Sequence, residues 1–545
     1  MKKEHWIEIH EDTPEKLTIA REVLDDVRHG TDVMQSIRSK PLSGGGYVAK
    51  HTLVTVYRQM VEDGELPEDP FLLRRIRMKP GRSLSGVTTV TVLTRPHPCP
   101  GHCIFCPDDS RMPKSYLPDE PGAARAYQNE FDPYRQVMSR LEAYEAVGHP
   151  TDKIELLILG GSWTAYERDY QEWFMLRCFD AMNGIDSANL EEAHRKNVNA
   201  PHRNVGLVIE TRPDEITPQE LAWLRRLGVT KVQMGAQSLD AHILDINLRG
   251  HSPQDTLKAT ALLRAAGFKI VLHWMPNLLG ATLETDREDF ALLWKSEEDG
   301  FGYCPDEIKI YPTQLLDNTE LYKYWQKGAY QPYSTQELID LIATIKPTIP
   351  PYCRVNRIIR DIPSTNVVAG NLRTSLRQDI LAEVARRGQE CQCVRCREVR
   401  GHSIDPKTLI LNDHIYHPAY AEEHFLSYLT PDNKLAGYLR LGLPKAFPDN
   451  LYGGKNPIRI LTDLDGAALI REVHIYGQSL EVGSEQTGAA QHIGLGTALL
   501  KEAETIAGKA GFQRLAVIAA IGTQEYYAAR GFNMGDLYMV KDINR

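Results

Sequence analysis

Between about residues 86 and 345, short apolar segments alternate with longer segments whose apolar residues recur at helical spacing. The segments that we interpret as strands are Val87–Leu93, Ile154–Leu159, Val205–Glu210, Lys231–Gly235, Ile270–Met275 and Glu307–Tyr311. The helical segments between them include Tyr166–Met182, Gln219–Leu227, Pro253–Ala266 and Glu284–Glu298. Strands that alternate with helices predict parallel β/α units with right-handed crossovers. The pattern therefore predicts a partial or complete β/α barrel, with its chemistry at the carboxyl ends of the strands.

Different patterns flank this region. Residues 1–80 are predicted to be helical, with examples at Glu15–Val27 and Leu53–Glu62. After residue 405 several strands precede one helix, which is typical of an α+β domain. Its predicted elements are Thr408–Leu411, Phe425–Leu429, Leu435–Leu441, Ala467–Ile475, the helix Leu495–Ala507, and Leu515–Ala519. We therefore expect four parts: a helical segment (1–80), the barrel (81–345), a connector (346–404) and the α+β domain (405–545).

Composition narrows the class of protein. The chain has 545 residues, 42% of them hydrophobic and 25% charged, which is ordinary for globular domains. Its formal net charge of −9 excludes a generally basic nucleic-acid binder, so any such binding has to use local patches. The N-terminus does not resemble a signal peptide and no apolar run is long enough for a membrane span. Nine cysteines, six of them in two tight clusters, indicate metal ligation in a reducing, cytoplasmic setting rather than disulfides.

Two stretches are rich in arginine and poor in acids. The first, residues 71–98, has no acidic residue, and the second, 351–377, has only Asp361. Such runs are usually solvated surface, but they also suit contacts to the phosphates of a polyanion. The candidate RNA-binding residues are Arg74, Arg75, Arg77, Lys79, Arg82, Arg354, Arg357 and Arg360.

The strongest chemical signal is the segment that contains Cys99, Cys103 and Cys106. The spacing C-x3-C-x2-C can hold three irons of a [4Fe–4S] cluster by thiolates and leave the fourth iron open. An open iron can bind S-adenosylmethionine and cleave it to a 5′-deoxyadenosyl radical. The alternative is structural zinc, which normally takes four protein ligands in paired short spacings. A single triplet with unequal gaps favours the iron–sulfur interpretation.

Candidate ligands for S-adenosylmethionine follow later predicted strands. Gly160 and Gly161 allow a ligand to approach the backbone closely, although glycine pairs also mark plain turns. Charged or polar groups stand at the ends of three further strands, where they can equally begin a helix or fill the barrel core. These candidates are Glu210, Arg212, Gln237 and His273.

The second cysteine cluster, Cys391, Cys393 and Cys396, lies in the basic connector. Three close thiolates can begin a structural zinc site, for which a fourth ligand has to come from elsewhere. The candidates are His402, Cys353 and Cys304, and the sequence leaves the choice open. The alternative is three free thiols.

In the α+β domain, a glycine-rich pattern opens the predicted helix. Amide groups at a helix N-terminus can bind a pyrophosphate, although the same pattern can be a simple helix start. The residues are Gln491, Gly494, Leu495, Gly496 and Thr497. Downstream, Tyr526 and Tyr527 can protonate a leaving thiolate or serve only as packing residues.

In combination, these features resemble the catalytic subunits of Elongator, in which a radical S-adenosylmethionine barrel precedes a GNAT acetyltransferase domain. The resemblance covers nearly the whole chain. It rests on the first cysteine triplet, Gly160-Gly161, Glu210 to Asp214, His273 to Pro276, Ile308 to Pro312, Arg360 to Pro363, and the motifs around residues 491–496 and 522–527. The cluster at Cys391–Cys396 departs from the eukaryotic members, so the chain is more similar to bacterial or archaeal ones.

The resemblance implies a tRNA enzyme that carboxymethylates carbon 5 of the wobble uridine, with acetyl-CoA and S-adenosylmethionine as cosubstrates. The implied route abstracts a hydrogen from the acetyl methyl group, adds the carbon radical to the uridine and hydrolyses the thioester. Lys309, Tyr526 and Tyr527 are the implied catalytic residues. The partners expected are the anticodon stem-loop and acetyl-CoA, with no membrane and no eukaryotic-type subunits, and a dimer remains open.

Two alternatives remain at this point. One is a protein lysine acetyltransferase with a structural iron–sulfur cluster, for which Glu472 is a candidate base. The other is an RNA-binding scaffold with no catalytic activity. If tRNA stimulates the turnover of acetyl-CoA and a lysine peptide does not, the tRNA-modifying enzyme is distinguished from both alternatives.

Overall fold

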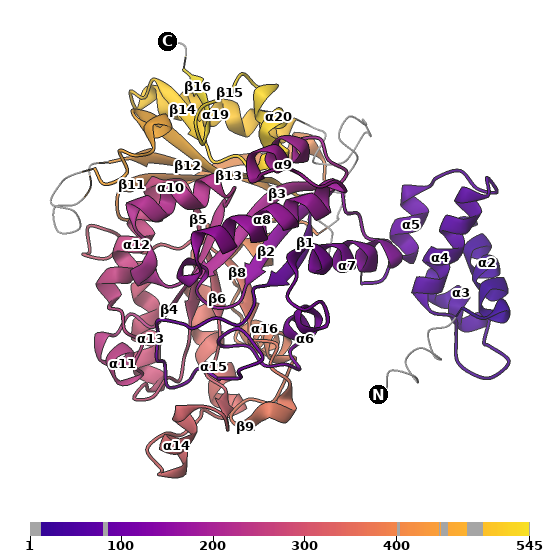
Figure 1. Cartoon of the computed structure of the whole chain (residues 1–545), viewed down its shortest axis with the longest axis horizontal. Helices are drawn as coiled ribbons and strands as arrows, with labels where there is room; N and C mark the ends of the chain where they lie inside the picture. Colours follow the sequence, from indigo (N-terminus) through magenta and orange to yellow (C-terminus); the bar gives the residue numbers. More distant parts are fainter. Residues whose placement is uncertain are drawn as a thin grey trace.

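The computed structural model describes residues 12–79, 86–400, 404–445, 447, 456–476 and 494–543. Figure 1 shows three parts: a helical bundle that extends to one side, a central barrel, and a second sheet domain above it. Apolar side chains of the barrel and of the second domain belong to one continuous core, whereas the bundle has a core of its own. The barrel and the C-terminal domain therefore pack as one body.

The central barrel is an open sheet of seven parallel strands in the order β1-β2-β3-β4-β5-β6-β8. Its strands are β1 (Thr88–Leu93), β2 (Lys153–Leu159), β3 (Arg203–Thr211), β4 (Lys231–Gln237), β5 (Lys269–Trp274), β6 (Glu307–Ile310) and β8 (Arg354–Ile358). The six predicted strands are confirmed. Because β1 and β8 are the two edges and are not paired in the described part of the chain, the sheet curls without closing.

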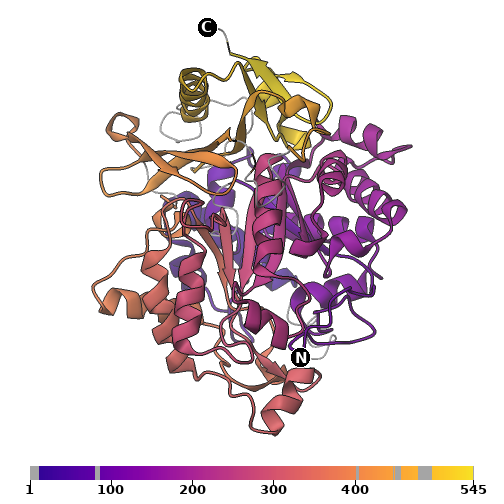
Figure 2. The same cartoon turned by 90° about the vertical axis from the view of Figure 1, so that its left-hand side faces the viewer.

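Helices cover the outer face of this sheet (Figure 2). They are α6 (Pro121–Gln128), α7 (Pro133–Ala146), α8 (Arg168–Asn183), α9 (Leu190–Asn197), α10 (Pro218–Arg226), α11 (Ala241–Ile246), α12 (Pro253–Ala265), α13 (Leu283–Leu292), α15 (Thr335–Ile345), α16 (Leu376–Arg386) and α17 (Val394–Arg397). A small outlying unit contains α14 (Glu320–Gln326) and the two-stranded sheet of β7 (Leu315–Leu316) and β9 (Val367–Ala369). The helix expected over Glu284–Glu298 ends at Leu292, and turns follow it.

The seventh strand, β8, lies in the segment that the sequence pattern assigned to the connector. It pairs with β6 in parallel, so the barrel continues past residue 345 to Ile358. The apolar pattern hides it because Arg354 and Asn356 face a polar interior. The boundary expected at 345 therefore has to move to the end of β8.

The C-terminal domain has a seven-stranded sheet in the order β10-β11-β12-β13-β14-β16-β15. Its elements are β10 (Ile410–Tyr416), β11 (Ala421–Leu429), β12 (Leu435–Pro444), β13 (Ala467–Ile475), α19 (Leu495–Lys509), β14 (Arg514–Val517), α20 (Gln524–Ala528), β15 (Asn533–Met534) and β16 (Met539–Asp542). Only β13 and β14 pair in parallel. This arrangement agrees with the predicted α+β domain.

The N-terminal bundle contains α2 (Pro14–Arg28), α3 (Val33–Ser39), α4 (Lys50–Glu62) and α5 (Pro70–Ile76). The side chains of Thr13, Asp32 and Asp69 accept backbone N–H groups at the starts of α2, α3 and α5. Both helical predictions for this region are confirmed. None of the helices in the described ranges combines the length and the apolar composition that a bilayer crossing requires.

Candidate functional site

The cysteine loop follows β1, at the carboxyl end of the barrel. Gly101 N donates to Cys99 Sγ at 3.4 Å, and Arg249 Nη1 lies 3.3 Å from Cys103 Sγ. The Ser162 Oγ, just after β2, lies 3.9 Å from Cys99 Sγ. The three thiols are thus held at the end of the sheet where parallel barrels carry their chemistry.

Two arginines lie against the cysteine loop. The Arg212 guanidinium approaches Gly101 so closely that a Cβ there would overlap Nη1. Its Nη2 donates to Arg249 O at 2.9 Å and to Asp214 at 2.9 Å, while Nη1 is buried without a partner among the described residues. The cations of Arg212 and Arg249 oppose the negative charge that three thiolates and a cluster would bring.

The separations of the sulfur atoms distinguish the two cysteine clusters. In the described part of the chain, Cys391, Cys393 and Cys396 form the one group of three ligand atoms that all lie within 4.8 Å of one another. Thiolates around a single tetrahedral zinc are about 3.8 Å apart, given Zn–S bonds of about 2.3 Å. The sulfurs of Cys99, Cys103 and Cys106 do not form such a group, which suits a four-iron cluster better than one ion. Their donor set, the adjacent arginines and the orphaned Nη1 fit this cofactor.

Gly160 and Gly161 form the turn after β2. Their φ angles are +131° and +92°, so both need glycine for the backbone conformation. A Cβ at Gly160 would overlap the Oγ1 of Thr94, whereas Gly161 lines the large cavity described below. The pair therefore brings backbone close to the cysteine loop and to the cavity at once.

Three predicted ligands converge at the carboxyl ends of β3, β4 and β5. His273 Nδ1 lies 3.4 Å from Glu210 Oε1, and its Nε2 lies 3.1 Å from Gln233 Oε1. Burial, with the cations Lys309, Arg360 and Arg249 nearby, holds the pKa of His273 well below its usual value, so its ring is neutral. Gln237 has φ +70°, and its Oε1 is buried without a partner among the described residues.

The side chain of Lys309 projects from β6 into the same space. Its Nζ lies 5.7 Å from the centre of the Tyr311 ring, and it faces the cavity together with His273 and Glu210. Tyr116, which the sequence patterns did not indicate, donates its hydroxyl to Glu210 Oε2 at 3.1 Å. The structure thus brings four polar side chains, from β3, β5, β6 and the loop after the cysteines, to one mouth of the barrel.

One cavity of about 1490 Å³ joins this mouth to the C-terminal domain. At one end Cys106, Gly161 and Glu210 line it, and at the other Tyr527 and His474 do. Its walls are the inward-facing residues of the barrel strands. The cavity is larger than most small-molecule sites, which span roughly 300–1,000 Å³, so it can hold more than one ligand.

The cavity also opens along the seam between β1 and β8, where arginines gather. Those that line it are Arg125, Arg140, Arg357, Arg377, Arg395 and Arg400. Burial, together with Arg377 and Arg354, lowers the pKa of Arg395 to about 10. The Nε of Arg140 and the Nη2 of Arg377 are buried without a partner in the described part of the chain. The seam therefore has an excess of positive charge.

Most of the predicted RNA-binding arginines have internal partners. Arg75 donates to Val27 O at 2.6 Å and to Thr31 O at 2.7 Å, and Arg77 is buried. Arg354 pairs with Glu398, and Arg360 donates to Ser115 Oγ at 2.7 Å. Other members of the set are more accessible: Arg74 is partly exposed, Lys79 is exposed, and Arg357 pairs with Asp361 on the surface at 2.8 Å. Arg82 lies outside the described residues.

The second cysteine cluster surrounds a lysine rather than a histidine. Lys346 Nζ lies 3.0 Å from Cys391 Sγ, 4.0 Å from Cys393 Sγ and 3.5 Å from Cys396 Sγ, and its side chain is buried. Among the candidates for a fourth ligand, Cys304 Sγ instead donates to Lys295 O at 3.6 Å, and His402 lies outside the described residues. Burial opposes the charge of Lys346, but Cys393, Cys391 and Cys396 raise its pKa, so a charged ammonium donates to the three sulfurs. Three close thiols suit a soft metal ion, but the ammonium would have to leave or lose its proton before an ion could bind there.

In the C-terminal domain, α19 begins after Gly494, which has φ +76°. The Gly496 backbone approaches the Tyr526 hydroxyl so closely that a Cβ would overlap it. The Arg530 guanidinium lies 3.6 Å above the Tyr526 ring, whereas Tyr527 is buried and lines the cavity. The structure therefore separates the two tyrosines. Tyr527 faces the cavity, whereas Tyr526 packs at the start of α19, the turn that also contains Leu495 and Thr497. Gln491 lies outside the described residues.

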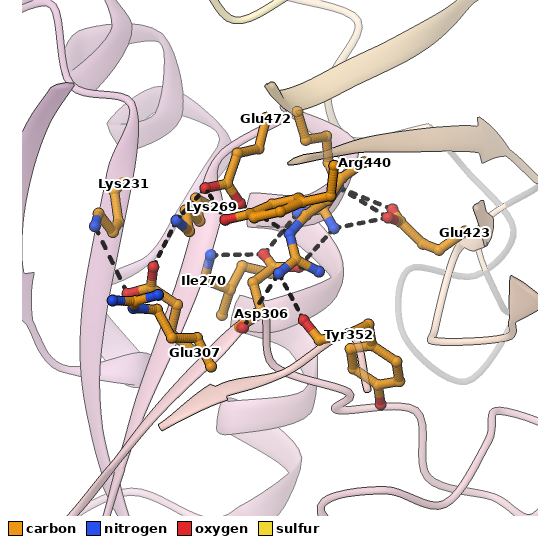
Figure 3. A network of polar contacts seen from close by, with 12 residues as sticks. Lys231, Lys269, Ile270, Asp306, Glu307, Tyr352, Glu423, Arg440 and Glu472 are labelled. Atoms are coloured by element: carbon orange, nitrogen blue, oxygen red, sulfur yellow. Dashed lines mark hydrogen bonds and ion pairs between the residues drawn. The ribbon is translucent and has the colours of Figure 1, made fainter. Parts of the chain in front are cut away.

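Buried ion pairs join the barrel to the C-terminal domain (Figure 3). Arg471 of β13 contacts both oxygens of Asp306 at 2.7 Å and Glu423 at 2.7 Å. Lys269 of β5 bridges Glu307, at 2.5 Å, and Glu472 of β13. Burial opposes ionisation, but Lys269 and Arg440 lower the pKa of Glu472 to about 2.

An open parallel barrel with a three-cysteine loop after its first strand defines the class as radical S-adenosylmethionine proteins, and family models agree. The model of the Radical SAM superfamily matches residues 96–293, and that of the Radical_SAM C-terminal domain matches residues 305–386. This class uses a [4Fe–4S] cluster and S-adenosylmethionine. The second match also covers β8.

Relatives of known name identify the family. A protein of Dehalococcoides mccartyi named tRNA uridine(34) acetyltransferase is 40% identical over 475 residues, which cover 86% of this chain and 100% of that protein. Elongator complex protein 3 of Homo sapiens is 31% identical over 545 residues, 96% of each chain. The structure of archaeal Methanocaldococcus infernus Elp3 with an N-terminal deletion has a TM-score of 0.71 at 35% identity, and covers 84% of this chain and 99% of that one. The chain belongs to the Elongator complex protein 3 family, so the predicted resemblance is confirmed.

Sequence patterns missed several residues of this site. Arg249 and Tyr116 carried no signal, because each lies in a segment without a strand or motif of its own. Lys346 lies 45 residues before Cys391, and nothing in the spacing links the two. The seam arginines Arg140 and Arg395 carried no signal, whereas Arg377 belongs to the arginine-rich stretch 351–377. The three come from separate helices, α7, α16 and α17, and line one cavity.

Proposed function

We propose that this chain carboxymethylates carbon 5 of the wobble uridine of tRNA, with acetyl-CoA and S-adenosylmethionine as cosubstrates. The observation that carries the proposal is the continuous cavity between the cysteine loop and the C-terminal domain. A reaction that combines two cosubstrates on one base needs both sites to open into a shared space. The names of the relatives, tRNA uridine(34) acetyltransferase above all, agree with this substrate.

The C-terminal domain is the proposed GNAT-type site for acetyl-CoA. Its parallel strands β13 and β14 pair only as far as Ile470 and Val517, although β13 continues to Ile475. The strands therefore part, and the residues at the gap, Arg471 to His474 and Val517 to Ile518, line the cavity. A parted parallel pair beside the N-terminus of α19 offers unpaired backbone groups to an amide-bearing chain and amide N–H groups to a pyrophosphate.

At the barrel mouth, the polar side chains supply binding and orientation. Gly160 and Gly161 offer close backbone contact, and Glu210 and neutral His273 offer hydrogen bonds to ribose or to the amino acid portion of S-adenosylmethionine. When bound, the cluster supplies the electron that cleaves S-adenosylmethionine and so starts radical chemistry. Lys309 lies where it can hold a carbonyl oxygen of the substrate by its ammonium.

Two groups have proposed roles at the other cofactor. Burial raises the pKa of the Tyr527 hydroxyl, so this group keeps its proton at neutral pH. Its proposed role is to donate a hydrogen bond to the leaving thiolate, because the raised pKa makes complete proton transfer unfavourable. Tyr526 is held by Arg530 and is proposed to shape the helix start. The division of roles follows from which hydroxyl faces the cavity.

The anticodon loop is proposed to enter at the seam between β1 and β8. A wobble base lies in a loop, where proteins can splay it from its neighbours. The arginines at the seam supply phosphate contacts on both sides of the opening. Lys79 and Arg74 of the bundle, with Arg357 near the seam, remain proposed contacts for the stem.

A zinc ion with a structural role is proposed at the thiols of Cys391, Cys393 and Cys396. Val394 N of the short helix α17 donates to Cys353 O at 2.9 Å, so an ion at these thiols would tie α17 to the start of β8. The ion would need a fourth ligand in place of the Lys346 ammonium.

The lysine acetyltransferase alternative is disfavoured by the environment of its candidate base. Glu472 is held by Lys269, Arg440 Nε at 2.9 Å and the Tyr438 hydroxyl at 2.7 Å. A carboxylate with a pKa of about 2 is a weak base for a substrate ammonium. The ion pairs give this residue a structural task instead.

The test is to purify the chain alone without oxygen, count iron and zinc, and incubate it with tRNA, acetyl-CoA, S-adenosylmethionine and a reductant. Mass analysis of the anticodon nucleosides is expected to find carboxymethyluridine at position 34, and none with Cys103→Ala. The Cys178→Ala variant is the matched control, because Cys178 is a buried thiol of the barrel core.

Three outcomes would contradict the proposal. Turnover of acetyl-CoA that a lysine peptide stimulates and tRNA does not would favour the acetyltransferase. Binding of tRNA without turnover would favour a scaffold. Unchanged product with Cys103→Ala would remove the cluster from the reaction.

A further inference from the structure

The barrel interior is hollow from one end to the other. On β1 the residues that line it are Thr89, Thr91 and Leu93, and on β2 they are Glu155, Leu157 and Leu159. This alternation is what places side chains on one face of a strand. Strands of six or seven residues span about 20 Å at a rise of roughly 3.3 Å per residue, so the cavity crosses the whole sheet. Its far end continues between the parted strands β13 and β14.

Charged residues surround the lumen near the amino ends of the strands, and we call them the collar: Glu155, Lys231, Lys269 and Glu307. Lys231 Nζ lies 2.6 Å from Glu155 Oε1 and 3.6 Å from Glu307 Oε2, and Lys269 Nζ lies 2.5 Å from Glu307 Oε1. Part of this collar is visible in Figure 3. Branched apolar residues normally fill the inside of a β/α barrel. A collar of paired charges keeps this lumen polar.

Gly206 of β3 stands opposite Glu155 of β2 in the register of the sheet. A Cβ at Gly206 would lie 3.4 Å from Glu155 Cγ, which is ordinary contact, and the φ of Gly206 is not in the left-handed region. The backbone therefore does not require glycine here. What the glycine contributes is the absence of a side chain on a lumen-facing position.

We propose that the barrel lumen is the route by which the acylated pantetheine arm of acetyl-CoA reaches from the C-terminal domain towards the cysteine loop. The inference rests on the proposed function and deepens it by assigning a path. Three observations support it: the lumen is continuous, it opens into the gap between β13 and β14, and the collar presents alternating donors and acceptors that can exchange hydrogen bonds with the amides of the arm. The thioester stays intact along this path, so no bond is made or broken in transit.

The first test fills the lumen. A graded series at one position, Gly206→Ala and Gly206→Leu, adds side chains of increasing size, and Val208→Phe fills a second lumen-facing position independently. We expect the leucine and phenylalanine variants to bind acetyl-CoA within about twofold of the unchanged protein and to cleave S-adenosylmethionine at a similar rate. Formation of carboxymethyluridine is expected to fall more than tenfold, with the alanine variant intermediate.

The second test captures the arm chemically and needs no turnover. In the Gly206→Cys variant, the introduced thiolate attacks CoA disulfide, forms a mixed disulfide and expels one CoA thiolate. Intact mass analysis is expected to show one additional CoA adduct relative to the unchanged protein. Glu172→Cys is the matched control, because Glu172 is exposed on α8 and far from the lumen in sequence and fold. Excess acetyl-CoA is expected to protect position 206 and not position 172.

Each result decides between the route and its alternatives. Full product formation by both Gly206→Leu and Val208→Phe, or equal capture at positions 206 and 172 without protection, would overturn the lumen route. Should the two bulky variants lose iron or unfold earlier on heating, the capture result decides alone. Failure of the unchanged protein to form carboxymethyluridine would instead overturn the proposed function, so the two failures are distinguishable.

Discussion

The buried carboxylate of Asp306 offers the sharpest test of how the barrel and the C-terminal domain are joined. Its two oxygens contact Arg471 at 2.7 Å each, Arg440 approaches at 3.4 Å, and Ile270 N donates to it at 2.9 Å. The carboxylate and both guanidinium groups are 0–1% exposed. We predict that Asp306→Asn, which keeps the size of the side chain and removes its charge, destabilises the protein strongly.

The magnitude follows from what the substitution leaves behind. Among carboxylate partners Arg471 would retain Glu423 and Arg440 would retain Glu472, and the new amide would turn N–H donors towards guanidinium donors. Breaking a buried pair by removing one partner costs about 3–5 kcal/mol. Because native proteins are stable by roughly 5–15 kcal/mol, the variant is expected to remain folded at room temperature.

The assay is urea denaturation followed by tryptophan fluorescence, with the slope on urea compared between variants. The matched control is Asp186→Asn. It removes the carboxylate from an ion pair of 2.8 Å with Arg177, and the Asp186 side chain is 75% exposed. Exposed pairs contribute about 0–1 kcal/mol. A loss for Asp306→Asn that equals the loss for Asp186→Asn would refute the argument that this buried network holds the domains together.

Three further predictions concern other parts of the chain. His194 has a buried Nε2 without a partner among the described residues, and burial, with Arg225 nearby, lowers its pKa to about 3. Because the unfolded ring has a pKa of about 6.5, the stabilising effect of the neutral ring is complete above that pH and is lost as the pH falls, by about 1–2 kcal/mol at pH 5 for a partly exposed ring. His194→Gln is expected to flatten the dependence of the thermal midpoint on pH between 5 and 6.5, and an unchanged slope would count against the argument. Gly160→Ala is expected to lower iron content and S-adenosylmethionine affinity at least tenfold, because φ is +131° and the new methyl overlaps Thr94. Gly184→Ala, at an open turn, is the control, and equal behaviour of the two variants would contradict the prediction. Arg140→Ala combined with Arg377→Ala is expected to weaken tRNA binding and to reduce its salt dependence by about two phosphate contacts. Arg75→Ala is expected to change the salt dependence little, because backbone carbonyls hold the Arg75 guanidinium. Gel shifts at two salt concentrations measure both effects, and the reverse order would place the tRNA on the bundle instead.

The local pattern of the chain was sufficient for most of the architecture. Six of the seven barrel strands, four of the helices between them and most of the strands of the C-terminal domain follow from apolar periodicity, because each element buries one face against a core. The cysteine triplet was equally readable, since ligand spacing within one loop is fixed by covalent geometry. The pattern did not predict β8, because inward-facing residues of a strand are usually apolar and this lumen is polar. Arg354 and Asn356 face inward, so the segment was interpreted as a basic connector.

What the sequence determined by itself was therefore the set of local units: a three-thiolate loop after a first strand, parallel β/α repeats, and an α+β domain with a glycine-rich helix start. What only the tertiary structure decided was which distant residues meet. The curl of the sheet lets Arg140 and Arg377 line one cavity, folding places Lys346 among three thiols, and the docking of β13 onto the barrel continues that cavity through both domains. Contacts of this kind depend on the sum of many packing choices across the chain, and no short stretch of residues encodes them.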